Sequence, residues 1–154
     1  MILYVAERTL MQLISWSQRH VRAELHVQPG IPVSAEESAL ILIAEDDPSV
    51  RSLLARVLRA RGYTVVEAAN GAEALEIAAT FEEPCQLLLT DVVMPELNGP
   101  ELAARLLRDG RAERVIYMTG YADVLLETRE PVTVLRKPFT PTALAEAVRD
   151  VLSH

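Results

Sequence analysis

Five short apolar runs that alternate with helical patterns constrain the fold of this chain more strongly than any other feature of its sequence. The runs are rich in Val, Ile, Leu or Thr, as buried strands are. They span residues 39–44, 64–68, 86–90, 114–118 and 132–135. The helical patterns follow at residues 48–61, 71–80, 99–108, 123–128 and 141–152. This alternation predicts an α/β fold, with a parallel sheet of five strands covered by helices on both faces.

The first of these helices has clear start and stop signals. Asp47 can cap its N-terminus, Pro48 occupies the first helical position, and Gly62 follows the last turn. These signals support a helix over residues 48–61.

The first 38 residues differ from the rest of the chain. Apolar positions spaced by threes and fours predict an amphipathic helix within residues 1–27. Prolines, a glycine and two adjacent glutamates between residues 26 and 38 are typical of a linker. We therefore expect an N-terminal helix and linker at residues 1–38 and a globular domain at residues 39–154.

Three roles for the N-terminal helix stay open. It could be a tail that packs on its own domain or is poorly ordered, it could pair with a second copy to form a homodimer, or it could dock a partner through the face that carries Trp16. His20 also lies on this helix, but it lacks the acidic neighbour expected to orient a phosphorelay imidazole.

Composition argues against several classes of function. The formal net charge of −7 argues against a broad surface for nucleic acid or anionic membrane. The longest strongly apolar run has six residues, whereas a transmembrane helix needs about 20. The first residues lack the basic region of a signal peptide. The single cysteine, Cys85, excludes an internal disulfide framework and a cysteine metal cluster, and it favours a cytoplasmic location.

Chemically active side chains follow four of the five predicted strands. Glu45 and Asp46 come after the first strand, Asp91 after the third, Thr119 after the fourth and Lys137 after the fifth. The carboxyl ends of parallel strands lie at one edge of the sheet, where ligands of open α/β sheets bind. Lys137 is the single lysine beside fourteen arginines, which makes its place at this edge notable.

These residue types point to phosphoryl chemistry. Three carboxylates within reach of one another repel unless a cation lies among them, and all-oxygen ligands suit Mg²⁺. A carboxylate can attack phosphorus to give an aspartyl phosphate, and Asp91 is the best nucleophile because it stands alone at a central strand end. A lysine ammonium and a threonine hydroxyl can hold the remaining phosphoryl oxygens. We expect Mg²⁺ as the only cofactor.

Four motifs surround these residues: LIAEDDPSVR (42–51), LLTDVVMPELNG (88–99), MTGY (118–121) and LRKPF (135–139). With these motifs the sequence resembles the CheY-like receiver domain of bacterial two-component response regulators. The resemblance covers residues 39–152. It implies a flavodoxin-like, doubly wound sheet with the strand order 2-1-3-4-5.

The resemblance also implies a set of metal ligands. Asp46 would bind Mg²⁺ directly and Glu45 would bind it through water. Asp91 and the backbone carbonyl of Val93 would complete the protein ligands.

The same resemblance assigns the phosphoryl transfer. Asp91 would accept the phosphoryl group, Thr119 would supply the switch hydroxyl, and Lys137 would supply the ammonium. The peptide bond before Pro138 is often cis in this family.

Two features depart from the family pattern. The switch aromatic of the family falls on Val134, so the coupling of hydroxyl movement to an aromatic flip is left open. Tyr121 or Phe139 could substitute, although Phe139 is expected to belong to the core. The stretch from Thr119 to Lys137 is a few residues short, so the helix within it should be short or irregular. A short or irregular helix argues against dimerisation through the face around it. The short form of this stretch resembles receivers of hybrid histidine kinases.

The function expected from these features is that of a single-domain response regulator. A sensor histidine kinase or a phosphotransfer protein would phosphorylate Asp91, and the signal would be a change of protein-protein contacts, without binding to DNA or to a membrane. The protein would catalyse its own phosphorylation and dephosphorylation without being a turnover enzyme. Bulk at Val93 and Tyr121 predicts slow loss of the phosphoryl group.

Two alternative functions would use the same site residues or the same fold. The first is a dimerising or scaffold receiver detached from a hybrid histidine kinase. The second is an aspartate-nucleophile phosphatase of the haloacid-dehalogenase type. That class needs a second Asp two residues after the nucleophile, where this chain has Val93, so the sequence disfavours it.

Overall fold

One five-stranded parallel sheet, in the order β2-β1-β3-β4-β5, forms the centre of the domain. A computed structural model describes residues 39–120 and 132–154. The strands are β1 (Leu40–Ala44), β2 (Thr64–Ala68), β3 (Leu87–Asp91), β4 (Val115–Thr119) and β5 (Thr133–Arg136). The predicted fold class and strand order are confirmed.

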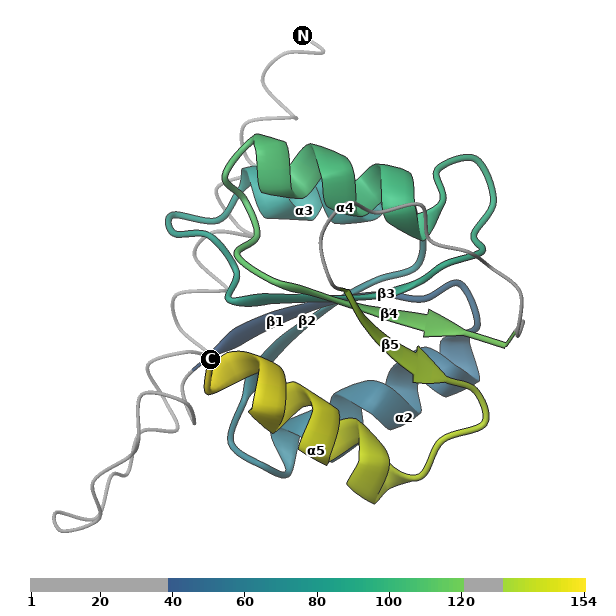
Figure 1. The fold of residues 1–154 in the computed structure, drawn as a ribbon. Coiled ribbons are helices and arrows are strands. Elements are labelled where there is room, and N and C mark those ends of the chain that lie inside the picture. The colour runs from purple at the N-terminus through teal and green to yellow at the C-terminus, as the bar shows by residue number, and fades with distance from the viewer. Residues whose placement is uncertain (1–38, 121–131) are drawn as a thin grey trace, which may run out of the picture. The chain divides into compact units, whose positions relative to one another are not determined.

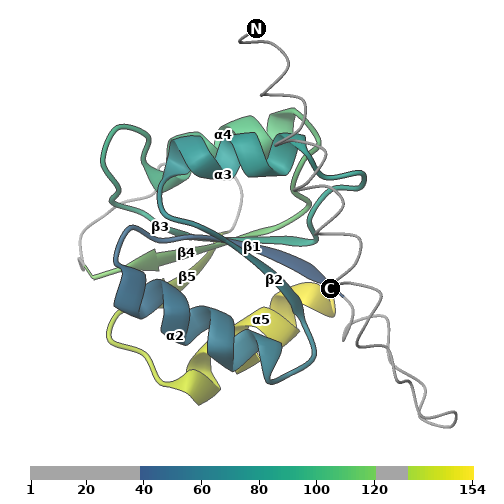
Figure 2. The same ribbon diagram turned by 180° about the vertical axis from the view of Figure 1, so that it is seen from behind.

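Helices cover both faces of this sheet. Helices α3 (Gly71–Ala79) and α4 (Gly99–Arg108) lie on one face, as Figure 1 shows. Helices α2 (Pro48–Arg59) and α5 (Pro141–Leu152) lie on the other face, which is seen from behind in Figure 2. The central strands β1, β3 and β4 are therefore buried on both sides, which explains why their sequences are continuous apolar runs.

Alternate residues of each central strand supply two separate cores. In β1, Leu42 and Ala44 pack beneath α3 and α4, whereas Ile41 and Ile43 pack beneath α2 and α5. All four side chains are fully buried. This two-sided burial fixes the register of β1 against β3. The polar residues that follow these strands are therefore held at fixed positions.

Helix α2 begins as predicted and ends earlier than predicted. The Asp47 side chain accepts hydrogen bonds from the backbone N–H groups of Ser49 and Val50, and Pro48 is the first helical residue. The helix ends at Arg59 rather than at residue 61. The N–H groups of Arg61 and Gly62 bond to carbonyls three residues earlier, which tightens the last turn, and Gly62 then turns the chain with φ of 90°.

Three strands lie one residue later than predicted. Asp91 pairs with Met118 in the ladder of β3 and β4, although an aspartate does not belong to an apolar run. Thr119 likewise pairs with Arg136 at the end of β4 and β5. The strand ends are determined by backbone pairing with the neighbouring strand. The pattern of apolar residues does not contain this information.

Several predictions concern residues outside the described part of the chain. These are the helix and linker at 1–38 with His20, the helix at 123–128, and Tyr121. The division of the chain at residue 38 stays a prediction for the same reason. Among the helices within residues 39–120 and 132–154, none has the length and hydrophobicity that a membrane span requires.

Candidate functional site

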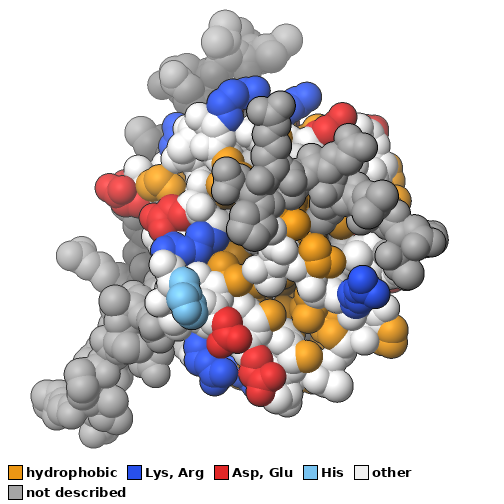
Figure 3. All heavy atoms as spheres, in the orientation of Figure 1, with side chains coloured by type: hydrophobic (Ala, Val, Ile, Leu, Met, Phe, Trp, Pro, Cys, Tyr) orange, Lys and Arg blue, Asp and Glu red, His pale blue; other side chains and the backbone are white. Residues whose placement is uncertain are grey.

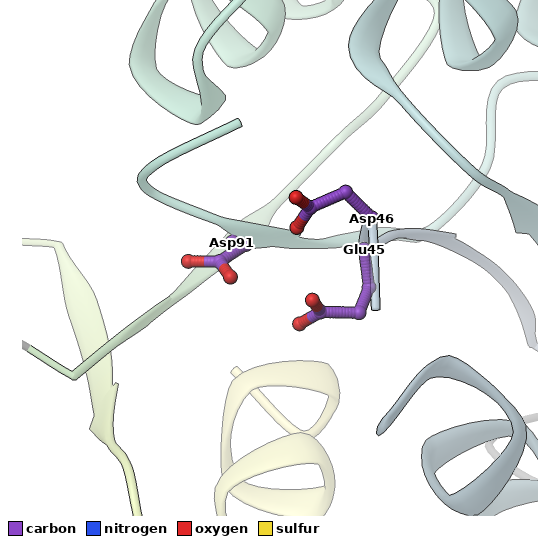
Figure 4. A group of neighbouring side chains, drawn as sticks. All are labelled: Glu45, Asp46 and Asp91. Carbon is purple, nitrogen blue, oxygen red and sulfur yellow. The ribbon is translucent and has the colours of Figure 1, made fainter. Parts of the chain in front are cut away.

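Three carboxylates gather at the carboxyl edge of the sheet. Glu45 and Asp46 follow β1 directly, and Asp91 is the last residue of β3, the strand beside β1. One carboxylate oxygen from each residue lies within 4.8 Å of the other two. Figure 4 shows the carboxylates of Glu45 and Asp46 turned toward the end of β3 that carries Asp91. The structure thus brings Asp91 to the adjacent pair Glu45 and Asp46, which lie 46 and 45 positions before it in the sequence.

Lys137 joins two of these carboxylates. Its Nζ donates to Glu45 Oε2 and to Asp91 Oδ2, each at 2.8 Å. The Glu45 side chain is 1% exposed and that of Asp91 is 14% exposed, so both ion pairs are largely shielded from water. A charge-assisted hydrogen bond in such a place is stronger than one at the surface, and it holds both carboxylates in a fixed relation.

Burial and charge shift two pKa values at this site. Burial raises the pKa of Glu45, and the nearby charge of Asp91 adds to this rise, while Lys137 and the Asp47 N–H oppose it. Burial lowers the pKa of Lys137, but its hydrogen bonds to Asp91 and Glu45 outweigh burial, so its pKa is raised overall. Lys137 is therefore a fixed positive charge throughout the neutral pH range.

The residues after Asp91 turn back toward it. The Val93 N–H donates to Asp91 Oδ1 at 3.3 Å, and the Val92 N–H donates to the Met118 carbonyl at 2.9 Å. Val93 is 55% exposed, so its side chain lies at the surface close to Asp91. The assignment of its carbonyl as a metal ligand stays a prediction.

Gly99 packs closely against the backbone of Asp91, a contact that the sequence patterns do not predict. Its N–H bonds to the Val92 carbonyl at 3.0 Å, which closes the loop between Asp91 and α4. A Cβ atom on Gly99 would lie 2.1 Å from the Asp91 carbonyl oxygen, so no other residue fits without a shift of the backbone. The sequence feature that could have indicated this position is the Asn98-Gly99 pair, in which Asn98 caps the N-terminus of α4.

Thr119 and Lys137 are neighbours in space. The Lys137 N–H donates to the Thr119 carbonyl at 2.8 Å, and Thr119 is buried at the end of β4. The peptide bond between Lys137 and Pro138 is cis, as the resemblance implied. Val134 lies on the edge strand β5 and is 39% exposed. The predicted switch role of Thr119 and Val134 stays a prediction, as does that of Tyr121.

The donor set fits a divalent cation. Three carboxylates face one ammonium, so negative charge is in excess, and Asp46 has no hydrogen bond or ion pair to any residue that the structure describes. All the available donor atoms are oxygens, which is the preference of Mg²⁺. Glu45, Asp46 and Asp91 are the residues that could hold it.

Comparison with known proteins gives a consistent result. The family model of the response regulator receiver domain matches residues 41–149. The response regulator receiver protein CpdR of Brucella abortus (strain 2308) is 40% identical over 116 residues, covering 73% of this chain and 95% of CpdR. The sensor kinase CckA of the same organism is 39% identical over 119 residues, covering 75% of this chain.

A solved structure agrees with the sequence matches. The crystal structure of the receiver domain from the hybrid histidine kinase CckA is 42% identical, with a TM-score of 0.61, and the match covers 74% of this chain and 99% of that domain. The chain spans only 13% of the length of the Brucella sensor kinase, but nearly the whole of CpdR.

Proposed function

This chain belongs to the response regulator receiver domain family, and we propose that it is a switch controlled by phosphorylation of Asp91. Receiver domains interact with histidine kinases or phosphotransfer proteins, and one of these would be the phosphoryl donor. The observation that carries the proposal is the cluster at the sheet edge. Asp91 lies within 4.8 Å of Glu45 and Asp46, and its Oδ2 is 2.8 Å from Lys137 Nζ.

The transfer itself needs little from the protein beyond position and charge. A carboxylate oxygen of Asp91 attacks the phosphorus, and a new O–P bond forms as the P–N bond to the donor histidine breaks. The electron pair of that bond stays on the imidazole nitrogen. Lys137 and the Thr119 hydroxyl are assigned to hold phosphoryl oxygens, because both lie beside Asp91 at the edge of the sheet.

Receiver domains bind Mg²⁺ at an acidic pocket. In this chain Asp46 and Asp91 would bind the ion directly, Glu45 would do so through water, and the Val93 carbonyl would be the further ligand. When bound, Mg²⁺ neutralises charge on the phosphoryl oxygens. Lys137, which also pairs with the buried Glu45 carboxylate, holds Asp91 through its Oδ2 atom.

The proposed output is a change of protein-protein contacts. Figure 3 shows hydrophobic side chains gathered over β5 and the start of α5, and Val134 is 39% exposed there. An apolar surface of this kind suits a protein partner. We also propose that residues 1–38 form a separate helix and linker that could pair two copies, and that the protein acts in the cytoplasm without binding DNA or a membrane.

Receiver domains are generally signalling domains rather than turnover enzymes, although the family does autophosphorylate. An aspartate-nucleophile phosphatase stays disfavoured because Val93 occupies the place of its second Asp. The second candidate function is a scaffold or dimerising receiver derived from a hybrid kinase. The similarity to the CckA receiver domain favours it over the phosphatase.

Labelling with a small phosphodonor tests the proposal. The full chain is incubated with acetyl phosphate and Mg²⁺, and its intact mass is compared with that of Asp91→Asn. We expect the wild type to gain one phosphoryl group and the variant to gain none. Size-exclusion elution of the same samples shows whether oligomerisation is the output. Failure of the wild type to be labelled, by acetyl phosphate or by any histidine kinase, would overturn the proposal.

A further inference from the structure

Arg51, near the start of α2, reaches back to the end of β1. Its Nη1 donates to the Glu45 carbonyl at 2.7 Å, and its side chain is only 18% exposed. We propose that Arg51 is a positioning residue, which holds the loop that carries Asp46 in the shape needed to bind Mg²⁺. This inference rests on the proposed function, because that function requires the metal site.

The loop around Asp46 is held from both sides. Arg51 fixes the peptide group between Glu45 and Asp46 through its carbonyl. The Asp47 N–H donates to Glu45 Oε1 at 3.1 Å, which fixes the peptide group between Asp46 and Asp47. Because each peptide group is planar, these two contacts set the direction in which the Asp46 side chain leaves the backbone.

The Asp46 carboxylate has no such support of its own. Asp46 is exposed, and no hydrogen bond or ion pair joins its side chain to another residue of the described part of the chain. Its direction toward Glu45 and Asp91 therefore depends on the backbone. Loss of the Arg51 guanidinium would free one of the two peptide groups that determine it.

A second arginine offers a matched control. Arg51 Nε lies 3.9 Å from Glu67 Oε2, and Arg59 Nη1 lies 2.9 Å from the other oxygen of Glu67. Arg59 also donates to the Val65 carbonyl at 2.9 Å. Arg59 thus shares the acidic partner of Arg51 on β2, but it has no hydrogen bond to Glu45.

Positioning and simple charge predict opposite changes in metal affinity. Arg51 is a cation beside a cation site, so removal of its charge alone would strengthen Mg²⁺ binding. If Arg51 positions Asp46, its removal weakens Mg²⁺ binding instead, by about tenfold as for other residues that orient metal ligands. The sign of the change therefore separates the two roles.

The test is a titration of the unphosphorylated full chain with Mg²⁺, followed by the backbone amide chemical shifts in NMR spectra. We expect Arg51→Gln to bind Mg²⁺ about tenfold more weakly than the wild type. Arg59→Gln should bind Mg²⁺ like the wild type. The same spectra report whether each variant is folded. Should Arg51→Gln be unfolded, Arg51→Lys keeps the charge, and weaker binding by that variant supports positioning directly.

Three outcomes would overturn the inference. Equal or tighter Mg²⁺ binding by Arg51→Gln would show that Arg51 acts through its charge or not at all. Equal weakening in Arg59→Gln would show that the loss is a general effect of the Glu67 ion pairs. Absence of Mg²⁺ binding by the wild type would overturn the proposed metal site as well, so the two failures are distinguishable.

Discussion

Replacement of Gly99 by alanine is expected to destabilise the domain and to displace Asp91. The added Cβ atom would lie 2.1 Å from the Asp91 carbonyl oxygen and 3.1 Å from Val92 Cα. Both are backbone atoms, so no side-chain rotation relieves the clash. Either the start of α4 or the end of β3 must move, and the end of β3 carries Asp91, the proposed phosphoryl acceptor.

The size of the effect follows from two opposing contributions. Overpacking of a close contact costs about 1–3 kcal/mol, and more where backbone must shift. Alanine in place of glycine stabilises a helix by at most about 1 kcal/mol. The free energy of unfolding should therefore fall by about 2 kcal/mol, at the upper end of this difference because the backbone must shift, which lowers Tm by roughly 8 °C in a domain of this size.

Thermal unfolding followed by circular dichroism measures this change. Gly120→Ala is the matched control, because a Cβ atom there would meet nothing within 4 Å. Acetyl phosphate labelling of the two folded variants should show slower modification of Gly99→Ala alone. A Gly99→Ala protein that melts together with Gly120→Ala would refute the argument that close backbone approach makes glycine necessary here.

Three other predictions concern the site and the core. Lys137→Met should slow phosphorylation by about 100-fold while Mg²⁺ still binds, since one donor to the phosphoryl group is lost; unchanged labelling kinetics would contradict this. Burial raises the pKa of the Cys85 thiol from 9.0 to about 11. Because the unfolded thiol ionises first, the free energy of unfolding should fall by on the order of 2 kcal/mol from pH 9 to 11. Urea titrations should lose this slope in Cys85→Ala. Phosphorylated protein should keep its phosphoryl group well beyond seconds in Mg²⁺ buffer if bulk at positions 93 and 121 screens it, as the sequence predicts; decay within seconds, followed by intact mass, would count against that role.

The apolar runs and the helical patterns between them were sufficient to predict a parallel sheet of five strands. Continuous apolar strands are buried on both faces, and the intervening helices must then cross over from one strand to the next, which leaves few arrangements. The cap formed by Asp47 follows from short-range geometry alone, and it was predictable for that reason. The burial of Cys85 was predictable from its place beside an apolar run.

The order of strands and helices along the chain was enough to predict which residues meet at one edge of the sheet, because all carboxyl ends of parallel strands lie there. Which atoms touch at that edge depends on the folded arrangement. Lys137 bridges Glu45, which is 92 positions away, and Asp91, and this depends on the register and twist of three strands. The contact of Arg51 with the Glu45 carbonyl and the close approach of Gly99 to Asp91 arise in the same way. Side-chain reach and backbone separation of a few tenths of an ångström decide these contacts, and hydrophobic periodicity carries no information at that scale.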